Sequence, residues 1–368
     1  MKFLCKKNIL QDAISVAQKA VTGKSTLPVL EGLFLSAMND SITFIGSDTD
    51  LSIETKCAAE VIESGAIVVD AKLFGEIIRK LPNDDVEIST LENNTLQISC
   101  QKSKFTLMHM NANDYPTIPE IEDENNVFNV PQGTLKNMIK GTIFAVAQDE
   151  TRPILTGVLF EVKNNKLNMV ALDGFRLALR SEYIESEQEI KVVIPGKTLN
   201  EISKILDDNQ ENVSITFSRN HILITINETK VISRLLEGEY INYNSIIPEE
   251  FNLKITAKRS ELLNCIERAS LMAKEGNTNL IKLNIEEDNL IITSNSQLGK
   301  VKEELSIILQ GQPLQIAFNS KYMIDVFKIM EEEEITMEFS SAVNPCVVKN
   351  KEVNNCTYLL LPVRLLNN

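Results

Sequence analysis

The sequence predicts an α+β fold made of three tandem repeats of one domain, each with two helices packed on antiparallel sheets. Two observations predict it. A pattern of strand, helix, acidic turn and strand recurs with a period of about 125 residues. The segments around that pattern alternate between apolar and polar residues, as half-buried strands do. We place the three domains at residues 1–122, 127–248 and 250–368.

The clearest repeated element is in the second half of each repeat. Each copy consists of a short apolar strand, a helix that begins with lysine, an acidic turn and an alternating strand. The lysines are Lys72, Lys197 and Lys321, at offsets of 125 and 124 residues, and an acidic residue follows each of them four positions later. The three copies are 67–89, 191–218 and 314–340.

A second element, a strand followed by a long helix, opens each repeat. Six residues of the first copy match six of the second at a constant offset of 125. A third copy at 251–276 keeps the strand and the helix but lacks the proline. The matched residues are Phe3, Leu10, Ile14, Pro28, Leu30 and Gly32 with Phe128, Leu135, Ile139, Pro153, Leu155 and Gly157.

A short motif in the first repeat suggests a different function. The stretch AVTGKSTLP (20–28) contains Gly-Lys-Ser-Thr, which is typical of the end of a phosphate loop. Such a loop needs another glycine five positions before the second one, where this chain has Gln18, and it needs a strand before it. The order here is helix, turn, strand. We therefore interpret the stretch as a helix C-terminus closed by Gly23, without a bound nucleotide.

The composition limits the remaining functions. Hydrophobic residues make up 43% of the chain and charged residues 24%, as in ordinary globular proteins. No apolar run approaches the roughly 18 residues of a membrane span. The start of the chain lacks the features of a secretory signal. Six cysteines without a CxxC pair predict free, mostly buried thiols in a reducing cytoplasm.

The sequence offers little for catalysis. The two histidines, His109 and His221, lie in separate predicted strands and share no motif, so neither a catalytic triad nor a histidine-based metal site is supported. We expect no catalytic residue, no metal and no cofactor. Acidic residues are numerous, and a carboxylate-only magnesium site remains an alternative on composition alone.

Charge is segregated along the chain. The whole protein carries a net charge of −14. The predicted helices nevertheless contain 16 Lys and Arg against 6 Asp and Glu, so the rest of the chain carries −24. Lysines on solvated helix faces are common, but three repeats can collect their basic helices on one side of an assembly, where they attract phosphates without reading bases. The helices are predicted at 6–21, 72–81, 132–148, 197–206, 258–274 and 321–330.

Taken together, these features resemble the bacterial DNA polymerase III beta subunit, the sliding clamp, over the full length of the chain. The stretches TLPVLEGLFL (26–35) and RPILTGVLFE (152–161) are similar to the strands that begin two of its domains. Three further stretches are similar to its most recognisable signatures: ALDGFRLAL (171–179), FNSKYMIDV (318–326) and YLLLPVRLL (358–366).

The resemblance implies a head-to-tail homodimer whose six domains close into a ring around duplex DNA. Basic helices would line the hole, and the ATP-consuming step would belong to a separate loader. Contacts to the phosphates would be weak and sequence-independent, which permits sliding. The residues expected to face DNA are Lys24, Lys72, Arg79, Lys102, Lys104, Lys197 and Arg268.

The resemblance also implies a hydrophobic groove that binds short peptides of the polymerase, the clamp loader and other partners. Two positions depart from the family: Phe175 stands where histidine or tyrosine is more familiar, and Leu172 where a small hydroxyl residue is common. We therefore expect a more apolar groove. The positions that match it are Leu155, Leu172, Gly174, Phe175, Arg176, Leu177, Ile246, Asn319, Tyr322, Val343, Leu359, Leu360, Pro362, Val363, Arg364 and Leu365.

For the contact between subunits, the resemblance implies that Phe105 and Leu107, on an edge-like strand, meet Leu271 and Met272 of the other chain. Two alternatives belong to other functional classes. One is a metal-dependent nuclease with a carboxylate site. The other is a repeat-built protein-interaction scaffold without a nucleic-acid partner.

Overall fold

The chain folds into two compact units. The computed structural model describes residues 1–23, 25–119, 121, 127–186, 188–276, 278–351 and 355–364. The first unit consists of Met1–Gly133 and Lys197–Leu235, and the second of Thr134–Gly196 and Leu236–Asn368. The middle repeat therefore contributes strands to both units, and no sheet is shared between them.

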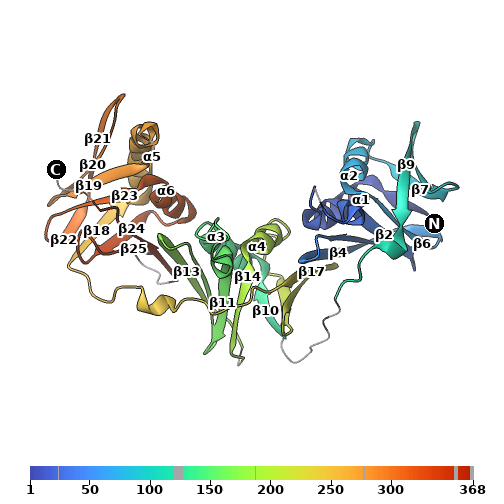
Figure 1. Cartoon of the computed structure of the whole chain (residues 1–368), viewed down its shortest axis with the longest axis horizontal. Helices are drawn as coiled ribbons and strands as arrows, with labels where there is room; N and C mark the ends of the chain where they lie inside the picture. Colours follow the sequence, from blue (N-terminus) through green and yellow to red (C-terminus); the bar gives the residue numbers. More distant parts are fainter. Residues whose placement is uncertain are drawn as a thin grey trace. The chain divides into compact units, whose positions relative to one another are not determined.

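A single 13-stranded sheet runs through the first unit (Figure 1). Its two ends belong to different repeats, and strand β4 of the first repeat pairs with β17 of the second. In spatial order the strands are β10 (Val127–Pro131), β15 (Asn212–Phe217), β16 (His221–Ile226), β17 (Thr229–Arg234), β4 (Leu51–Ala58), β3 (Ser41–Ser47), β2 (Gly32–Met38), β6 (Gly65–Asp70), β9 (Ser103–Asn111), β8 (Thr95–Cys100), β7 (Asp85–Leu91), β1 (Lys2–Lys6) and β5 (Glu60–Glu63).

Two helices of the first repeat, α1 (Lys7–Ala17) and α2 (Ala71–Lys80), lie side by side against this sheet (Figure 1). Their apolar faces and the inner faces of the strands form one core, in which the rings of Phe3, Phe44 and Phe74 are fully buried. The side chain of Asp70 caps α2 by accepting a hydrogen bond from the Leu73 amide at 2.6 Å.

A nine-stranded sheet and a four-stranded sheet form the second unit. The order in the larger sheet is β14 (Ile190–Pro195), β11 (Gly157–Lys163), β12 (Lys166–Leu172), β13 (Arg176–Tyr183), β26 (Cys356–Leu360), β25 (Cys346–Asn350), β24 (Glu334–Phe339), β18 (Leu253–Lys258) and β22 (Ile308–Gly311). The order in the smaller sheet is β21 (Gly299–Ser306), β20 (Asn289–Ser296), β19 (Leu280–Ile285) and β23 (Leu314–Asn319).

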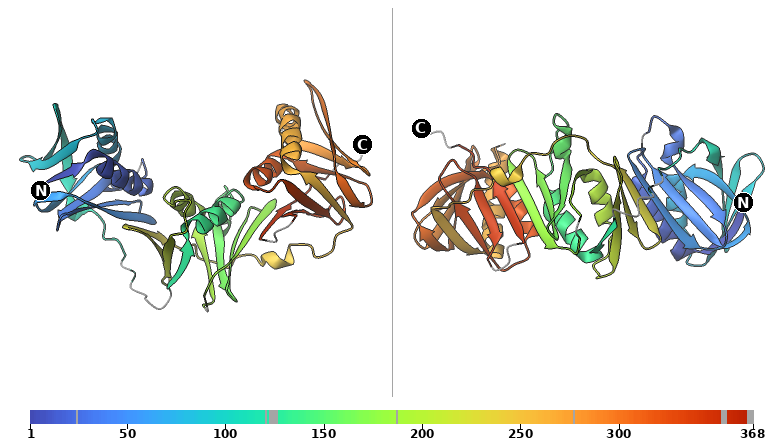
Figure 2. Two further views of the ribbon diagram at one scale, coloured as in Figure 1. Left: turned by 180° about the vertical axis from the view of Figure 1, so that it is seen from behind. Right: turned by 90° about the horizontal axis from the view of Figure 1, so that it is seen from below.

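Helices α5 (Arg259–Glu275) and α6 (Ser320–Ile329) pack against each other in the second unit (Figure 2, left). The remaining helices are α3 (Gln132–Ile143) and α4 (Gly196–Ser203). Short 3₁₀ turns connect elements at Gln18–Ala20, Pro28–Glu31, Ala112–Asp114, Pro153–Thr156 and Tyr243–Ser245.

The structure confirms the predicted fold class and the repeated order of elements. Every strand pairing in the described part of the chain is antiparallel, and all six predicted helices are present. Three helices end earlier than predicted: α1 at Ala17, α3 at Ile143 and α4 at Ser203. The prediction that Gly23 closes the first helix is wrong, because α1 ends at Ala17 and one 3₁₀ turn, capped at Val21, follows it.

The close approach of β3 to α1 allows the packing of helix on sheet to be tested. Gly46 of β3 lies against the end of α1, and a Cβ atom placed there would be 2.1 Å from the carbonyl oxygen of Ala17. Backbone cannot yield as a flexible side chain can, so we expect Gly46→Ala to lower the free energy of unfolding by about 1–3 kcal/mol. Gly23→Ala is the matched control, since no atom lies within 4 Å of the added methyl group. Urea unfolding of both variants measures the difference, and equal midpoints would contradict the packing.

Candidate partner and nucleic-acid interfaces

A tight turn between β12 and β13 organises the first candidate site, which we name the groove and which comprises the sixteen positions given above for peptide binding. The Asp173 carboxylate accepts hydrogen bonds from the amides of Phe175 at 2.9 Å and Arg176 at 3.0 Å. Gly174 has a φ of 93°, a conformation that residues with side chains rarely adopt. The sequence Asp-Gly-Phe-Arg therefore fixes both the turn and the direction of the two side chains that follow Gly174.

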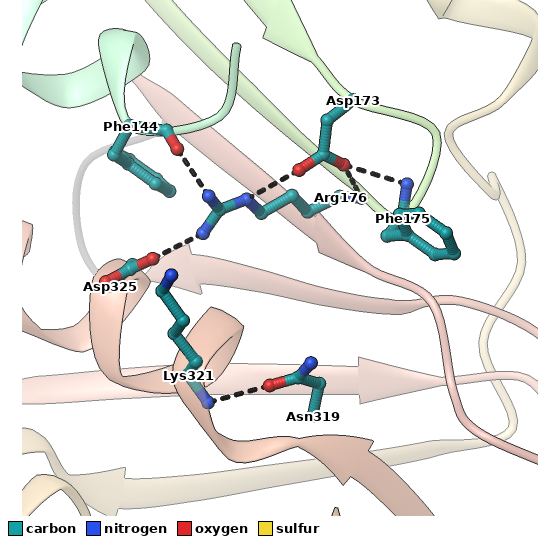
Figure 3. A network of polar contacts seen from close by, with 7 residues as sticks. All are labelled: Phe144, Asp173, Phe175, Arg176, Asn319, Lys321 and Asp325. Carbon is teal, nitrogen blue, oxygen red and sulfur yellow. Dashed lines mark hydrogen bonds and ion pairs between the residues drawn. The ribbon is translucent and has the colours of Figure 1, made fainter. Parts of the chain in front are cut away.

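Arg176 joins the turn to a helix of the third repeat (Figure 3). Its Nε lies 3.1 Å from Asp173 Oδ2, and its Nη1 lies 2.6 Å from Asp325 Oδ2 on α6. Its Nη2 donates to the Phe144 carbonyl oxygen at 2.5 Å. The side chain is only 9% exposed. These hydrogen-bond partners therefore replace the water molecules that the guanidinium loses on burial.

The rings of Tyr322 and Phe144 cover the guanidinium. The Tyr322 ring centroid lies 4.5 Å from the Arg176 Cζ, in the geometry of a cation–π contact. Phe175 stacks on Tyr322 at a centroid distance of 6.2 Å and an interplanar angle of 24°. Because Phe175 is 59% exposed, it presents an apolar ring to solvent beside a buried charge.

The floor of the groove is a packed apolar cluster. Leu155, Leu172, Leu177 and Leu359 are at most 4% exposed and share one cluster, and Ile246 packs against it from the connection between the repeats. Leu172 is a full member of this cluster. The structure therefore places these five predicted residues together.

The end of the described chain lies along the same surface. Leu360 ends β26 and is buried. The Leu361 amide donates to the Phe175 carbonyl oxygen at 2.9 Å, and the Val363 amide donates to the Ala317 carbonyl oxygen at 2.8 Å. Pro362 lies between these two bonds, and the Val363 side chain is 41% exposed. The chain is thus held by its backbone while its side chains remain accessible.

The remaining predicted groove positions have different roles. Asn319 caps α6 by accepting a hydrogen bond from the Lys321 amide at 3.0 Å (Figure 3). Val343 lies in the connection between β24 and β25 with 65% of its surface exposed. Arg364 is exposed, and Leu365 lies outside the described residues.

Two residues that build the groove were not among the predicted site residues: Asp173 and Asp325. Signals for both exist in the sequence. Asp173 precedes a glycine in a turn, and Asp325 is the acidic residue that follows the repeated lysine by four positions. Only the fold brings Asp325 within reach of Arg176, which is 149 positions away in the chain.

Four of the predicted DNA-facing residues of the first repeat are exposed cations. Lys72 and Arg79 lie on α2 and line a cleft of ≈500 Å³ between the helices of that repeat. Lys102 and Lys104 lie at the β8–β9 hairpin of the 13-stranded sheet. None of the four forms an ion pair with another residue that the structure describes. All four can therefore accept an external anion.

Two other predicted DNA-facing residues are already paired. Lys197, at the start of α4, forms an ion pair with Asp48 of the first repeat. Arg268 donates to Glu303 through Nε at 2.9 Å and Nη2 at 2.6 Å. These hydrogen bonds raise the pKa of Arg268 and hold the pKa of Glu303 below its usual range. Lys24 lies outside the described residues.

The predicted subunit contact falls on two exposed edges. Strand β9 pairs with β8 along its length, but only its last residues pair with β6, so the backbone near Phe105 and Leu107 is open on one side. Phe105 is 39% exposed, and Leu271 on α5 is 59% exposed, while Leu107 and Met272 are half-buried. Apolar side chains beside an open strand edge are suited to pairing with another chain.

Three further findings concern the chain's chemistry. All six cysteines are free and five are buried, as predicted; Cys57 is half-buried. Within the described ranges, no three His, Cys, Asp or Glu side chains gather in a way that could hold a metal ion. None of the helices in those ranges has the length and apolar character needed to span a bilayer.

Comparison with known proteins identifies the family. Three family models match in order: the N-terminal domain of the DNA polymerase III beta subunit at residues 1–119, its central domain at 129–242 and its C-terminal domain at 244–364. The chain belongs to the DNA polymerase III beta subunit family. It is 38% identical to the beta sliding clamp of Bacillus subtilis, with 99% of this chain and all of the relative aligned.

Solved structures agree with this assignment. The crystal structure of the Bacillus subtilis sliding clamp superposes with a TM-score of 0.96 at 38% identity and covers all of both chains. That of the Thermotoga maritima beta subunit superposes with a TM-score of 0.94 at 31% identity, covering 99% of this chain and all of the other. The resemblance inferred from the sequence is therefore confirmed over the whole chain.

The Arg176 contacts can be tested by removing one partner. Asp325→Ala leaves a buried guanidinium without one of its two carboxylate partners, so we expect the free energy of unfolding to fall by about 1.5–3 kcal/mol. Glu76→Ala is the matched control, because Glu76 occupies the equivalent position of the first repeat and is exposed. We expect it to change stability by less than about 0.5 kcal/mol. Similar losses in urea unfolding of both variants would refute the structural role of Asp325.

Proposed function

We propose that two copies of this chain close head to tail into a ring around duplex DNA, and that the ring tethers the replicative polymerase through the groove. As a member of its family the chain is a DNA sliding clamp, a non-catalytic processivity subunit that works with DNA and polymerase. The full-length match to three consecutive clamp domains carries the proposal. We place the domains at 1–122, 127–248 and 250–368 and the protein in the cytoplasm.

The DNA-facing surface is formed by the basic helix faces and nearby turns. Seven residues are proposed, namely Lys24, Lys72, Arg79, Lys102, Lys104, Lys197 and Arg268. Lys197 and Arg268 share their charge with carboxylates, so an approaching phosphate would have to compete with Asp48 or Glu303. Lys72, Arg79, Lys102 and Lys104 have no such competitor among the described residues, and they would supply most of the attraction. Scattered lysines bind phosphates weakly, which permits sliding.

The proposed subunit contact joins β9 with the corresponding edge of the other chain's third repeat. Strand β21 ends the four-stranded sheet and pairs only with β20 in the described chain, so it offers a second open edge. Pairing the two edges would satisfy both backbones and bury Phe105 and Leu107 against Leu271 and Met272. Because the same two surfaces meet at both contacts, two copies close the assembly.

The groove is proposed to bind extended peptides from the polymerase III catalytic subunit, the clamp loader and other proteins with a clamp-binding motif. The leucine cluster supplies an apolar floor, and the exposed rings and side chains of Phe175 and Val363 extend the apolar surface. This combination suits a short segment with leucine or phenylalanine side chains. Phe175 and Leu172 make the site more apolar than in a groove with histidine and a hydroxyl residue at these positions.

Topological linkage gives the first prediction. When a clamp loader and ATP are supplied, we expect the protein to be retained on nicked circular DNA and lost when the circle is cut, because a ring can leave only over an end. Gel filtration of the loaded DNA before and after linearisation measures this. Equal retention on both forms would contradict encirclement. The double variant Lys72→Gln and Arg79→Gln serves as a control, since it weakens phosphate contacts but leaves the ring closed.

The second prediction concerns the groove. Removal of Pro362 to Asn368 deletes the Val363 amide, which donates to the Ala317 carbonyl oxygen, together with the exposed Val363 side chain. We expect binding of a polymerase-derived peptide to fall at least tenfold, while the mass of the assembly in solution stays that of a dimer, because the deletion does not touch β9 or α5. Fluorescence polarisation of the labelled peptide and light scattering measure the two effects. Unchanged peptide affinity would refute the groove.

A further inference from the structure

The two junctions between repeats have the same construction within their own units. In the first unit the strand order is β10, β15, β16, β17, β4, β3, β2 and β6. In the second unit it is β18, β24, β25, β26, β13, β12, β11 and β14, which is the same order one repeat later. Each junction therefore has an outer sheet face that a connecting segment can cover.

The connecting segments begin in the same way. After the first repeat, the Tyr115 hydroxyl donates to the Ile45 carbonyl oxygen at 3.3 Å. After the second, the Tyr240 hydroxyl donates to the Val170 carbonyl oxygen at 3.1 Å. Both residues of the second pair stand 125 positions after those of the first. The two tyrosines thus fix equivalent segments to equivalent strands.

The packing of the sheet residues beneath the two connecting segments differs. At the second junction, Leu159, Val170 and Tyr243 are at most 5% exposed and form part of the packed cluster. At the first junction, the residues equivalent to Leu159 and Val170 are Phe34 and Ile45, and both are only half-buried. A cavity of ≈520 Å³ remains there, large enough for a ligand of drug-like size.

This cavity, which we name the first-junction pocket, has an apolar wall and a charged rim. Its wall includes Phe34, Ile45, Tyr115, Leu223 and Ile232, and the rings of Phe34 and Tyr115 approach to a centroid distance of 5.6 Å. Such a wall favours an aromatic group, which can meet both rings at their edges.

The rim carries one lysine that has no ion pair within the described ranges. Lys230 and Glu54 both line the pocket and lie opposite each other on β17 and β4. Glu54 lies 3.8 Å from Lys56, so its charge is shared with another lysine. Lys230 is exposed and forms no ion pair with any residue in the described ranges. One cation therefore remains to meet an anionic ligand at the edge of an apolar cavity.

We propose that the first-junction pocket binds the carboxy-terminal aromatic residue of a partner polypeptide, with the aromatic ring against Phe34 and Tyr115 and the terminal carboxylate at Lys230. This site is separate from the groove, which is built from second-unit residues. A terminal residue combines the aromatic ring and the carboxylate within one amino acid, which matches an apolar wall with a lysine at its rim.

The absence of tryptophan from this chain allows a direct test. The probe is the peptide Ac-Gly-Ser-Gly-Trp with a free carboxylate, whose indole fluorescence is measured as full-length protein is added. The same peptide with a C-terminal amide tests the carboxylate, and indole-3-propionate tests whether a polypeptide is needed. We expect the acid peptide to bind with a Kd below about 0.3 mM and at least about threefold more tightly than the amide.

Variants locate the site. Lys230→Gln is expected to remove the difference in affinity between the acid and the amide peptide. Leu223→Glu is expected to abolish binding of both peptides, because it places a charge in the apolar wall. Leu223 is only half-buried, so we expect this variant to fold. Thermal unfolding confirms that both variants fold. The deletion of Pro362 to Asn368, which removes part of the groove, is expected to leave peptide binding at this pocket unchanged. This control distinguishes the two sites even if the groove does not bind peptides.

Four outcomes would overturn the proposal. These are no binding up to about 1 mM peptide, equal binding of acid and amide, binding that survives Leu223→Glu, and loss of binding on deletion of the C-terminal residues. If indole-3-propionate binds as tightly as the peptide, the pocket accepts a free aromatic acid, and the polypeptide origin is refuted.

Discussion

Strand pairing between successive repeats is the interaction on which the rest of the structure depends. Strand β4 pairs with β17 in the first unit, and β13 pairs with β26 in the second, so neither sheet ends at a repeat boundary. At the first junction the buried hydroxyls of Thr55 and Thr229 also bond to each other at 2.8 Å. A polar pair of this kind loses its bond if the register slips, which favours one alignment of the repeats. The groove and the first-junction pocket both lie on surfaces that these pairings create.

The same turn, held by an aspartate carboxylate, occurs at both junctions but contacts a different cation at each. Asp48 and Asp173 stand at equivalent repeat positions, and each accepts hydrogen bonds from the backbone amides of its own turn. The first also meets Lys197, an exposed lysine on a helix of the next repeat. The second meets Arg176, which is buried and whose other partners include Asp325 of the next repeat. Burying a cation under aromatic rings creates an apolar outer surface, whereas an exposed ion pair does not.

Most of the architecture could be predicted from the sequence because the repeat period and the alternation of apolar residues are local properties. The order of strands and helices followed from three aligned copies, and the six helices were placed to within a few residues except at the ends of α3 and α4. The end of α1 was misplaced because glycine closes many helices, and here a 3₁₀ turn ends at Ala20 first. The partners of Arg176, Lys197 and Arg268 could not be predicted, because each carboxylate comes from a distant segment. The first-junction pocket could not be predicted either, since its volume depends on how side chains pack.

The lysines that begin helices argue for a function beyond folding. Lys72, Lys197 and Lys321 stand in the first turns of α2, α4 and α6, where the helix dipole disfavours a cation by about 0.3–1 kcal/mol each. The caps Asp70 and Asn319 satisfy amides of α2 and α6, and Asp70 also supplies an opposing charge. Only Lys197 has a carboxylate partner in the described structure. A position that is unfavourable for the helix yet occupied by lysine in all three repeats is explained by an external anion. In the function proposed above, DNA phosphates are that anion at Lys72 and Lys197.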